Sequence, residues 1–380
     1  MTKKSFLLGT SSLATAVLIA TAAQAGSVGS KDAMSVSVGG EFVYNVAIYD
    51  QDVSAGAGRG YSLGVDEAEI FVEASNIADN GILYGVAFEL NAGAAASDNA
   101  GSDEAYAYID SASWGRIELG DNDDATDRMY LESDDALVGR LGPDGDASDY
   151  FQFGTGGGIA ATGNSITGDA TKVIYFTPRI GGFQAGASLT PDTGANSGTA
   201  GLTETDNDGD FENVVGLGLN WDGSFDKVGL TLSLTGEFGD AETATGAASL
   251  GEVETISVGG KISFEAFALG AGYVDLAEQS QTAAARAGGA DAGSYWTVGG
   301  SYTTGPWGVS ASWFESSKGN TTGISDTDIE ILSFDASYSV APGWDLAAAL
   351  HLIEADNINA TAAAVNNDGT VFLISNQFNF

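Results

Sequence analysis

The sequence predicts an all-β protein, a 16-stranded antiparallel β-barrel that closes on itself and spans a membrane. Three observations predict this fold: a secretory signal at the start of the chain, strands with one apolar and one polar face, and an aromatic residue at the end of the last strand. Such strands place apolar side chains toward lipid and polar side chains toward a watery interior. A closed barrel also pairs every backbone polar group, which lipid requires.

Residues 1–25 have the three parts of a secretory signal peptide. Lys3 and Lys4 precede an apolar run, and the small residues Ala23 and Ala25 form an Ala-x-Ala cleavage site. The apolar run is shorter than the roughly 20 residues that a membrane-spanning helix needs. We therefore expect cleavage after Ala25 and an exported chain, residues 26–380, that forms one barrel domain.

Alternation with a period of two identifies the strands. In the segment VGLTLSLTGEF, Leu230, Leu232 and Leu234 occupy one face, while Thr231 and Ser233 occupy the other. Sixteen segments of this kind begin near Ala33, Gly64, Gly81, Asp103, Trp114, Thr171, Gly182, Phe211, Phe225, Glu252, Phe267, Ser294, Trp307, Asp328, Trp344 and Gly369. Tight turns and longer polar loops alternate between them, which is typical of outer-membrane barrels.

Tryptophan residues gather at the predicted short turns. Trp114, Trp221, Trp307 and Trp344 all lie at or beside such a turn. Outer-membrane barrels carry girdles of aromatic side chains where the membrane meets water. We therefore expect these tryptophans at one membrane interface, although ordinary packing anchors would also explain them.

The charge of the chain is strongly negative. Thirteen Lys and Arg residues stand against 52 Asp and Glu residues, which gives a formal net charge of −39. Such a protein repels nucleic acid and attracts cations, so we expect no nucleic-acid partner. Adaptation to salty surroundings is an alternative explanation. The chain has no cysteine, which excludes disulfides and thiolate metal sites.

The last segment, TVFLISNQFNF, alternates and ends in an aromatic residue. Alternate positions of this segment carry Phe372, Ile374, Phe378 and Phe380. A terminal Phe on an alternating strand is the feature that outer-membrane assembly machinery recognises, and we expect this strand to close onto the first. The expected location is the outer membrane of a Gram-negative bacterium.

One hairpin resembles a known family. The segment VIYFTPRIGGFQAGASLTPD, with Tyr175, Pro178, Gly182 and Phe183, is similar to the hairpin after the pore loop of Gram-negative general diffusion porins. WGRIELGD, from Trp114, resembles the strand before that loop, and the acidic balance resembles alphaproteobacterial members. The resemblance implies a homotrimer in outer-membrane lipids and lipopolysaccharide. It also implies a passive diffusion channel for small hydrophilic solutes and ions, with a long third loop folded into the lumen.

The longest segment between predicted strands runs from Gly120 to Lys172, and folding inside the barrel would explain its length. The resemblance implies that its charges narrow the pore. These constriction candidates are Asp121, Asp123, Asp124, Asp127, Arg128, Glu132, Asp134, Asp135, Arg140, Asp144, Asp146 and Asp149. The pore-wall candidates are Arg59, Glu67, Glu69, Arg116, Glu118, Lys172 and Lys261.

Because few cationic side chains oppose many carboxylates, we expect the channel to prefer cations. Solvation of the mouths and loops would also account for many of these carboxylates.

A calcium site is one further possibility. Asp206, Asp208 and Asp210 have a spacing that resembles the start of a calcium loop, but Val215 stands where the closing Glu would be. The segment is therefore not an EF-hand. We expect no cofactor, and we leave open Ca²⁺ bound by acidic loops.

Two other functions are alternatives to a channel. A barrel phospholipase would pair the single histidine, His351, with a Ser and an Asn, but no G-x-S-x-G nucleophile turn is present and we expect no enzyme. A secreted acidic, calcium-binding β-protein would show G-G-x-G-x-D repeats. The chain shows no such repeat.

Overall fold

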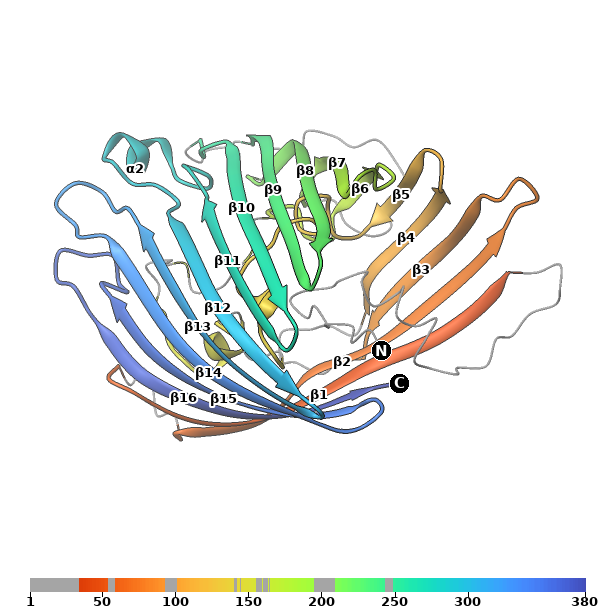
Figure 1. The fold of residues 1–380 in the computed structure, drawn as a ribbon. Coiled ribbons are helices and arrows are strands. Elements are labelled where there is room, and N and C mark those ends of the chain that lie inside the picture. Colours follow the sequence, from red (N-terminus) through yellow and green to blue (C-terminus); the bar gives the residue numbers. More distant parts are fainter. Residues whose placement is uncertain are drawn as a thin grey trace.

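The computed structural model describes residues 34–380 except 54–58, 93–100, 140–141, 144, 155–158, 160–162, 164, 195–208 and 243–248. Sixteen antiparallel strands form one closed barrel in chain order (Figure 1). They are β1 (Ser35–Gln51), β2 (Tyr61–Ile77), β3 (Leu83–Asn91), β4 (Gly101–Ser111), β5 (Gly115–Asp121), β6 (Thr171–Phe176), β7 (Phe183–Asp192), β8 (Phe211–Phe225), β9 (Val228–Ala241), β10 (Val253–Phe264), β11 (Phe267–Asp275), β12 (Ser294–Thr304), β13 (Trp307–Lys318), β14 (Thr327–Ala341), β15 (Trp344–Asp356) and β16 (Asn367–Asn379). The predicted fold class is confirmed, and each strand begins within a few residues of its predicted start.

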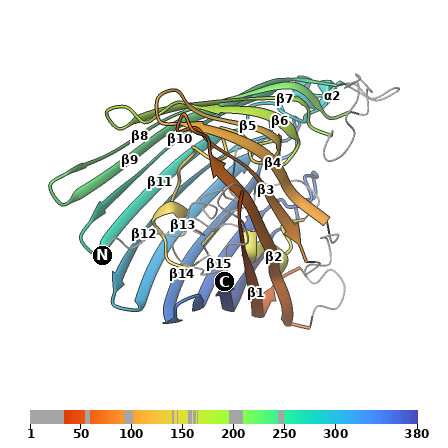
Figure 2. The same ribbon diagram turned by 90° about the vertical axis from the view of Figure 1, so that its right-hand side faces the viewer.

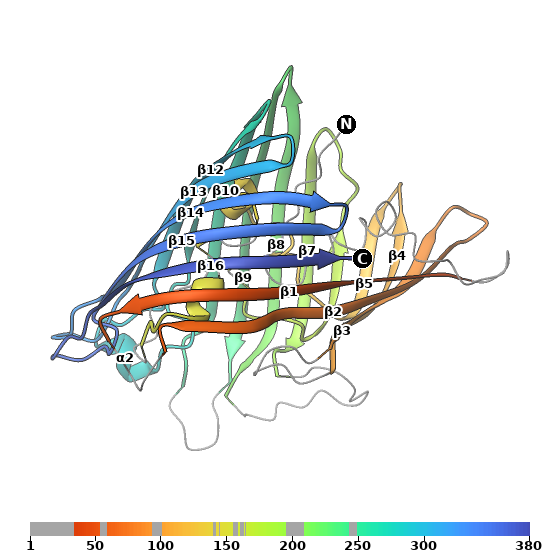
Figure 3. The ribbon, with the colours of Figure 1, turned by 90° about the horizontal axis from the view of Figure 1, so that it is seen from below.

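The barrel closes between its first and last strands. β1 and β16 pair antiparallel from Glu41 opposite Asn379 to Gln51 opposite Gly369. Beyond this ladder, Gly40 N donates to Phe380 O at 3.0 Å and Phe380 N donates to Gly40 O at 3.1 Å. Figure 3 shows the two strands side by side. Closure leaves no exposed sheet edge, which a strand in lipid could not tolerate.

The outer face is apolar, as the alternation predicts, and the inner face is polar on strands such as β9, whereas part of the inner face of β1 and β13–β16 is apolar. On β9, Leu232 and Leu234 are 47% and 52% exposed on the outside, whereas Ser233 and Thr235 are buried on the inside. In water such exposed leucines would be unfavourable, but a hydrocarbon environment suits them. The side chains therefore specify both the closed ladder and its lipid-facing surface.

Aromatic side chains mark the end of the barrel where the short turns lie. There Trp221 stacks on Phe225 with ring centroids 5.8 Å apart, and Trp344 stacks on Phe378 at 5.7 Å. Trp307, at the start of β13, is 58% exposed. These rings lie where the sequence predicts an interfacial girdle.

Helical structure is sparse in the described part of the chain. The helices are η1 (Asp134–Ala136), η2 (Gly145–Asp149) and α2 (Ala283–Ala287). Among the residues described, none of the helices combines the length and the apolar character needed to cross a bilayer. η1 and η2 belong to the long connection between β5 and β6, and Figure 2 shows this yellow connection inside the ring of strands.

Candidate functional site

The described residues of the connection between β5 and β6 (122–139, 142–143, 145–154, 159, 163 and 165–170) lie against the inner wall of the barrel. We call these residues the inserted segment. Ser133 N donates to Thr297 Oγ1 on β12 at 3.0 Å, and Val138 N donates to Ser310 Oγ on β13 at 3.3 Å. Further along, Gln152 N donates to Gln51 Oε1 on β1 at 2.9 Å. The segment therefore follows the wall around much of the lumen.

Glycine residues on the inner face provide the room for this path. A Cβ on Gly270 of β11 would lie 2.7 Å from Glu132 O, and a Cβ on Gly272 would lie 2.8 Å from Leu131 O. On β8, a Cβ on Gly218 would lie 2.7 Å from the sulfur of Met129. Real Cβ atoms do not approach other atoms so closely. Gly270 and Gly272 are therefore needed where the backbone of the segment lies on the wall, while at Gly218 the side chain of Met129 would have to move.

A second stretch of the inserted segment packs by apolar contact. Ala147 and Phe151 are buried with inward residues of β1 and β13–β16, including Ile331, Ile353 and Val371. Tyr150 stacks on Tyr49 of β1 with centroids 6.2 Å apart. This cluster fills the lumen beside β13–β16 and β1.

Glu118 of β5 joins the segment to the strand before it. Its carboxylate is fully buried and accepts hydrogen bonds from Arg116 Nε, from Arg128 Nη1 and, at 2.8 Å, from Asn122 Nδ2. The guanidinium of Arg116 lies 4.0 Å from the ring centroid of Tyr108, and that of Arg128 lies 4.6 Å from Phe176. Two cations therefore share one buried anion, and aromatic faces fix their positions.

Two lysines on the wall also hold the segment through its backbone. Lys172 of β6 is buried and its Nζ donates to Asn122 O and, at 2.5 Å, to Gly168 O. Lys261 of β10 donates to Asp135 O. These candidate wall cations therefore lie on the inner face, where they bind the segment.

Several acidic residues of the segment fold back on it. Asp124 is buried and accepts from Thr126 Oγ1 at 2.6 Å and from Asp127 N at 2.8 Å. Asp135 Oδ2 accepts from Glu132 N at 2.8 Å, and both residues are buried. The carboxylates of Asp124 and Asp135 therefore stabilise the shape of the segment, because buried polar groups need partners.

Three carboxyl groups of the segment have raised pKa values. Burial and the nearby Asp124 carboxylate raise the pKa of Asp127 to about 7. Burial raises the pKa of Asp135 to about 6, although the Glu132 N–H and Lys261 oppose this change. Burial and the Asp103 carboxylate raise the pKa of Asp169 to about 6. Their charge therefore changes in the range between mildly acidic and neutral pH.

The inner wall of β1–β4 is lined with carboxylates. Glu41 lies opposite Glu69 across the β1–β2 ladder. Carboxylate oxygens of Glu69, Glu89 and Asp103 lie within 4.8 Å of one another, close enough to share a cation. Glu104, Asp123 and Asp169 form a second group of this kind. Glu67 lies on β2, where the pairing with β1 is irregular.

The remaining sequence candidates lie elsewhere. Asp121 was expected in the constriction, but it ends β5 on the outer face, two residues after the exposed Leu119, and accepts from the Thr171 hydroxyl. The side-chain period of two places it there, because Glu118 faces inward. Arg59 is exposed in the loop before β2.

The inserted segment also contains the remaining constriction candidates that the structure describes. Asp134 begins η1 and its Oδ1 accepts from Ser133 Oγ at 3.2 Å, while Asp149 is exposed at the end of η2. Asp146 lies within η2. Arg140, Asp144, Asp206 and Asp208 lie outside the described residues, and of the calcium candidates only Asp210, just before β8, is described.

The sequence reasoning missed Asp103, Asp169, Glu237 and the wall glycines. Glu237 of β9 accepts from Ser165 Oγ at 3.2 Å and from Ile166 N at 2.7 Å, and so it holds the returning part of the segment. A signal for the path was present, because glycines occupy alternate polar-face positions at Gly216 and Gly218 and again at Gly270 and Gly272. No sequence pattern of this kind identifies Asp103 or Asp169, because they meet their acidic neighbours only in the folded barrel.

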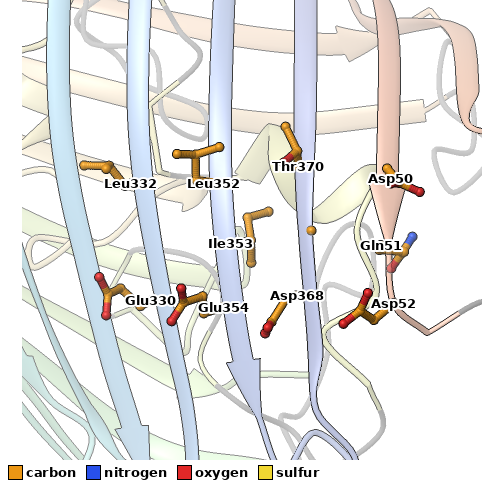
Figure 4. Close-up of a pocket in the computed structure, with 11 residues that line it drawn as sticks. Asp50, Gln51, Asp52, Glu330, Leu332, Leu352, Ile353, Glu354, Asp368 and Thr370 are labelled. Carbon is orange, nitrogen blue, oxygen red and sulfur yellow. The ribbon is translucent and has the colours of Figure 1, made fainter.

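The outer face carries a row of carboxylates at the end with the long loops. Glu315 pairs with Glu330, Glu330 with Glu354 and Glu354 with Asp368 across successive strands. Figure 4 shows Glu330, Glu354 and Asp368 in line with Asp52. All are exposed, whereas the intervening inward residues are buried. Carboxylates are unfavourable in hydrocarbon, so the lipid-facing band ends below this row.

Comparisons with known proteins agree with this architecture. The Vibrio cholerae outer-membrane protein OmpT has a similar structure, with 14% identity, a TM-score of 0.59, and coverage of 93% of this chain and 100% of that one. An anion-selective porin from Comamonas acidovorans is similar at 16% identity and a TM-score of 0.60, with 91% and 100% coverage. At these identities the likeness concerns the fold.

Two curated relatives are uncharacterized proteins of Rickettsia. The Rickettsia bellii protein is 22% identical over 323 residues, which covers 70% of this chain and 72% of that protein. The Rickettsia felis protein is 27% identical over 214 residues, which covers 51% of this chain and 43% of that protein, so the chain spans less than half of this relative.

A sequence profile described as Gram-negative porin matches residues 11–358. With its closed barrel of sixteen strands and a segment folded inside, this chain belongs to the Gram-negative porin family, whose barrels lie in the outer membrane.

Proposed function

We propose that the protein is a passive diffusion channel for small hydrophilic solutes and ions, with a preference for cations. The family and the barrel support a channel. One contrast supports the preference. Carboxylates line the wall of β1–β4, whereas Lys172, Lys261 and Arg128 hold the inserted segment and Arg116 pairs with Glu118.

Such a wall favours cations for electrostatic reasons. A cation that passes Glu69, Glu89 and Asp103 can exchange part of its hydration shell for carboxylate oxygens, while an anion is repelled. Charged rims also hold water that an apolar solute would have to displace. The grouped oxygens further support our proposal that Ca²⁺ can be bound by acidic residues, because hard cations prefer several oxygen ligands.

Reversal potentials in planar bilayers test the preference. Purified protein is inserted between solutions of high and low KCl, and the zero-current voltage is measured. We expect a voltage whose sign corresponds to K⁺ moving down its gradient. A voltage of the opposite sign would overturn the cation preference, and a protein that gives no current would overturn the channel itself.

We also propose that the channel is a homotrimer surrounded by outer-membrane lipids and lipopolysaccharide. One similar structure of Vibrio cholerae OmpT is described as a trimer form. The outer carboxylate row lies where lipid headgroups and their counterions would surround the barrel. Conductance that increases in groups of three equal steps supports the trimer, and uniformly single steps contradict it.

The phospholipase alternative finds no support in the position of His351. Its Nδ1 lies 2.8 Å from Ser333 Oγ, but the histidine is fully buried on the inner face of β15. Lipid lies on the opposite side of the wall. We therefore expect purified protein to leave phospholipid vesicles intact, and release of fatty acid that is lost on His351→Ala would contradict this expectation.

A further inference from the structure

A cavity of about 440 Å³ lies at the turn end of the barrel, between the start of the inserted segment and the β6–β7 turn. Three arginines line it, each from a different element: Arg116 from β5, Arg128 from the inserted segment and Arg179 from the turn. The whole chain has 13 basic residues against 52 acidic ones. The meeting of three guanidinium groups in one cavity therefore sets this place apart from the acidic lumen.

Two of these guanidinium groups are fixed before any ligand arrives. Arg116 and Arg128 each donate one N–H to Glu118, and each lies against an aromatic ring. A guanidinium carries five N–H donors. Because one is used on Glu118, both side chains retain donors while they line the cavity, and their side chains are only 19% and 16% exposed.

Arg179 is held by neutral groups. Its Nη1 donates to Gly182 O at 2.7 Å, and its Nη2 donates to Gln184 Oε1 at 2.9 Å. Gln184 in turn donates to Thr177 O at 3.1 Å. Among the described residues, no carboxylate lies within ion-pair distance of Arg179. Its positive charge is therefore oriented but not neutralised at short range.

The charges and the apolar groups of the cavity indicate the kind of ligand. Asp110, 3.9 Å from Arg116, is the only acidic residue of the lining, and Glu118 is shared by Arg116 and Arg128. The lining residues together with Glu118 therefore carry one more positive than negative charge, which comes from Arg179. The lining also includes Phe176 and Pro178. A ligand that matches both parts has an oxyanion at one end and a short apolar portion at the other.

We propose that this cavity binds a small organic anion at the turn-side mouth of the channel. The carboxylate or phosphate of the solute accepts hydrogen bonds from Arg116, Arg128 and Arg179, and its apolar part lies against Phe176 and Pro178. The site is local, so it is compatible with a cation preference of the lumen as a whole. It adds to the proposed channel function a place where one class of anion is retained.

Binding of 4-fluorobenzoate to the detergent-purified protein, followed by the width of its ¹⁹F NMR signal, tests this proposal. We expect saturable broadening with wild type and about tenfold weaker binding with Arg179→Gln, because a charge-assisted hydrogen bond is lost. Lys227→Gln is the matched control. It removes a cation from another short turn, where Lys227 pairs with Glu265 away from the cavity, and it should bind as wild type does.

Two further probes define the ligand class. Neutral 4-fluorobenzamide should show no saturable broadening, and inorganic phosphate should displace 4-fluorobenzoate only at concentrations at least about tenfold higher, because it lacks the apolar part. Equal binding by Arg179→Gln and wild type, saturable binding of the amide, or equally effective displacement by phosphate would each overturn the proposal. Bilayer conductance of the same preparation separates the two hypotheses: conducting protein without saturable binding refutes the anion site and leaves the channel function standing.

Discussion

Arg128 and Glu118, ten residues apart, form an ion pair that ties the inserted segment to β5, the strand from which it leaves. Glu118 is fully buried, and Arg116 binds its other oxygen. An isolated buried carboxylate is costly, so both guanidinium groups are needed where the chain turns into the lumen.

We expect Arg128→Gln to loosen the start of the inserted segment. Glu118 would keep Arg116 but lose the partner that holds the segment, so current noise in the open channel should increase and the unfolding temperature should fall. Single-channel recordings and thermal unfolding by circular dichroism check this. Lys227→Gln, which breaks an exposed ion pair with Glu265 between two short turns, is the control and should leave both quantities unchanged.

We expect the double variant Glu69→Gln and Glu89→Gln to lower the ratio of cation to anion permeability. The change removes negative charge from one group of acidic side chains on the inner wall while it keeps the size of the side chains. Reversal potentials in a KCl gradient measure the ratio. Glu330→Gln removes a charge from the outer face and should have no effect, so a loss of selectivity there but not on the inner wall would contradict the assignment of the lumen.

We expect cation preference to weaken as the pH falls from about 8 to about 5. The raised pKa values of Asp127, Asp135 and Asp169, about 7, 6 and 6, mean that these groups bind protons in this range. An ordinary Asp, with a pKa of about 3.9, would remain charged. The permeability ratio measured as a function of pH checks this, and Asp127→Asn should remove the part of the change near pH 7.

The raised pKa values of Asp127, Asp135 and Asp169 also predict how the free energy of unfolding depends on pH. Between about pH 4 and 7 the folded protein binds more protons at these three sites than the unfolded chain does. Their contribution to the free energy of unfolding therefore increases as the pH falls through this range. The free energy of unfolding of wild type and of Asp127→Asn can be measured by denaturant unfolding in detergent at several pH values. The difference between the two isolates the contribution of Asp127. A difference that does not depend on pH would argue against the raised pKa of Asp127.

We expect Gly270→Ala to destabilise the barrel or displace the inserted segment. The added Cβ would lie 2.7 Å from Glu132 O and 3.0 Å from Ala136 Cβ. Overpacking of this kind typically costs about 1–3 kcal/mol. Thermal unfolding and single-channel conductance should both change. Gly64→Ala is the matched control on β2, where no atom lies within 4 Å of the new Cβ, and an equal effect there would show that wall packing is not the cause.

The sequence by itself determined the strands, their inward and outward faces and the closed barrel. These depend on a side-chain period of two, which is local, and on the need to pair every backbone group in lipid. The apolar Leu232 and Leu234 and the polar Ser233 are assigned to faces by this rule alone. The family resemblance implied a loop inside the lumen, and the length of the segment after Gly120 was consistent with it.

Only the tertiary structure decided what each charge does. The side-chain period of two places Glu118 inside, but only the fold brings its carboxylate to Arg116 and Arg128. Asp103 and Asp169 join acidic groups whose members come from distant parts of the chain. Because the inserted segment has no repeating pattern, its path depends on contacts with glycines and polar groups of strands that fold around it, and no local rule contains those contacts.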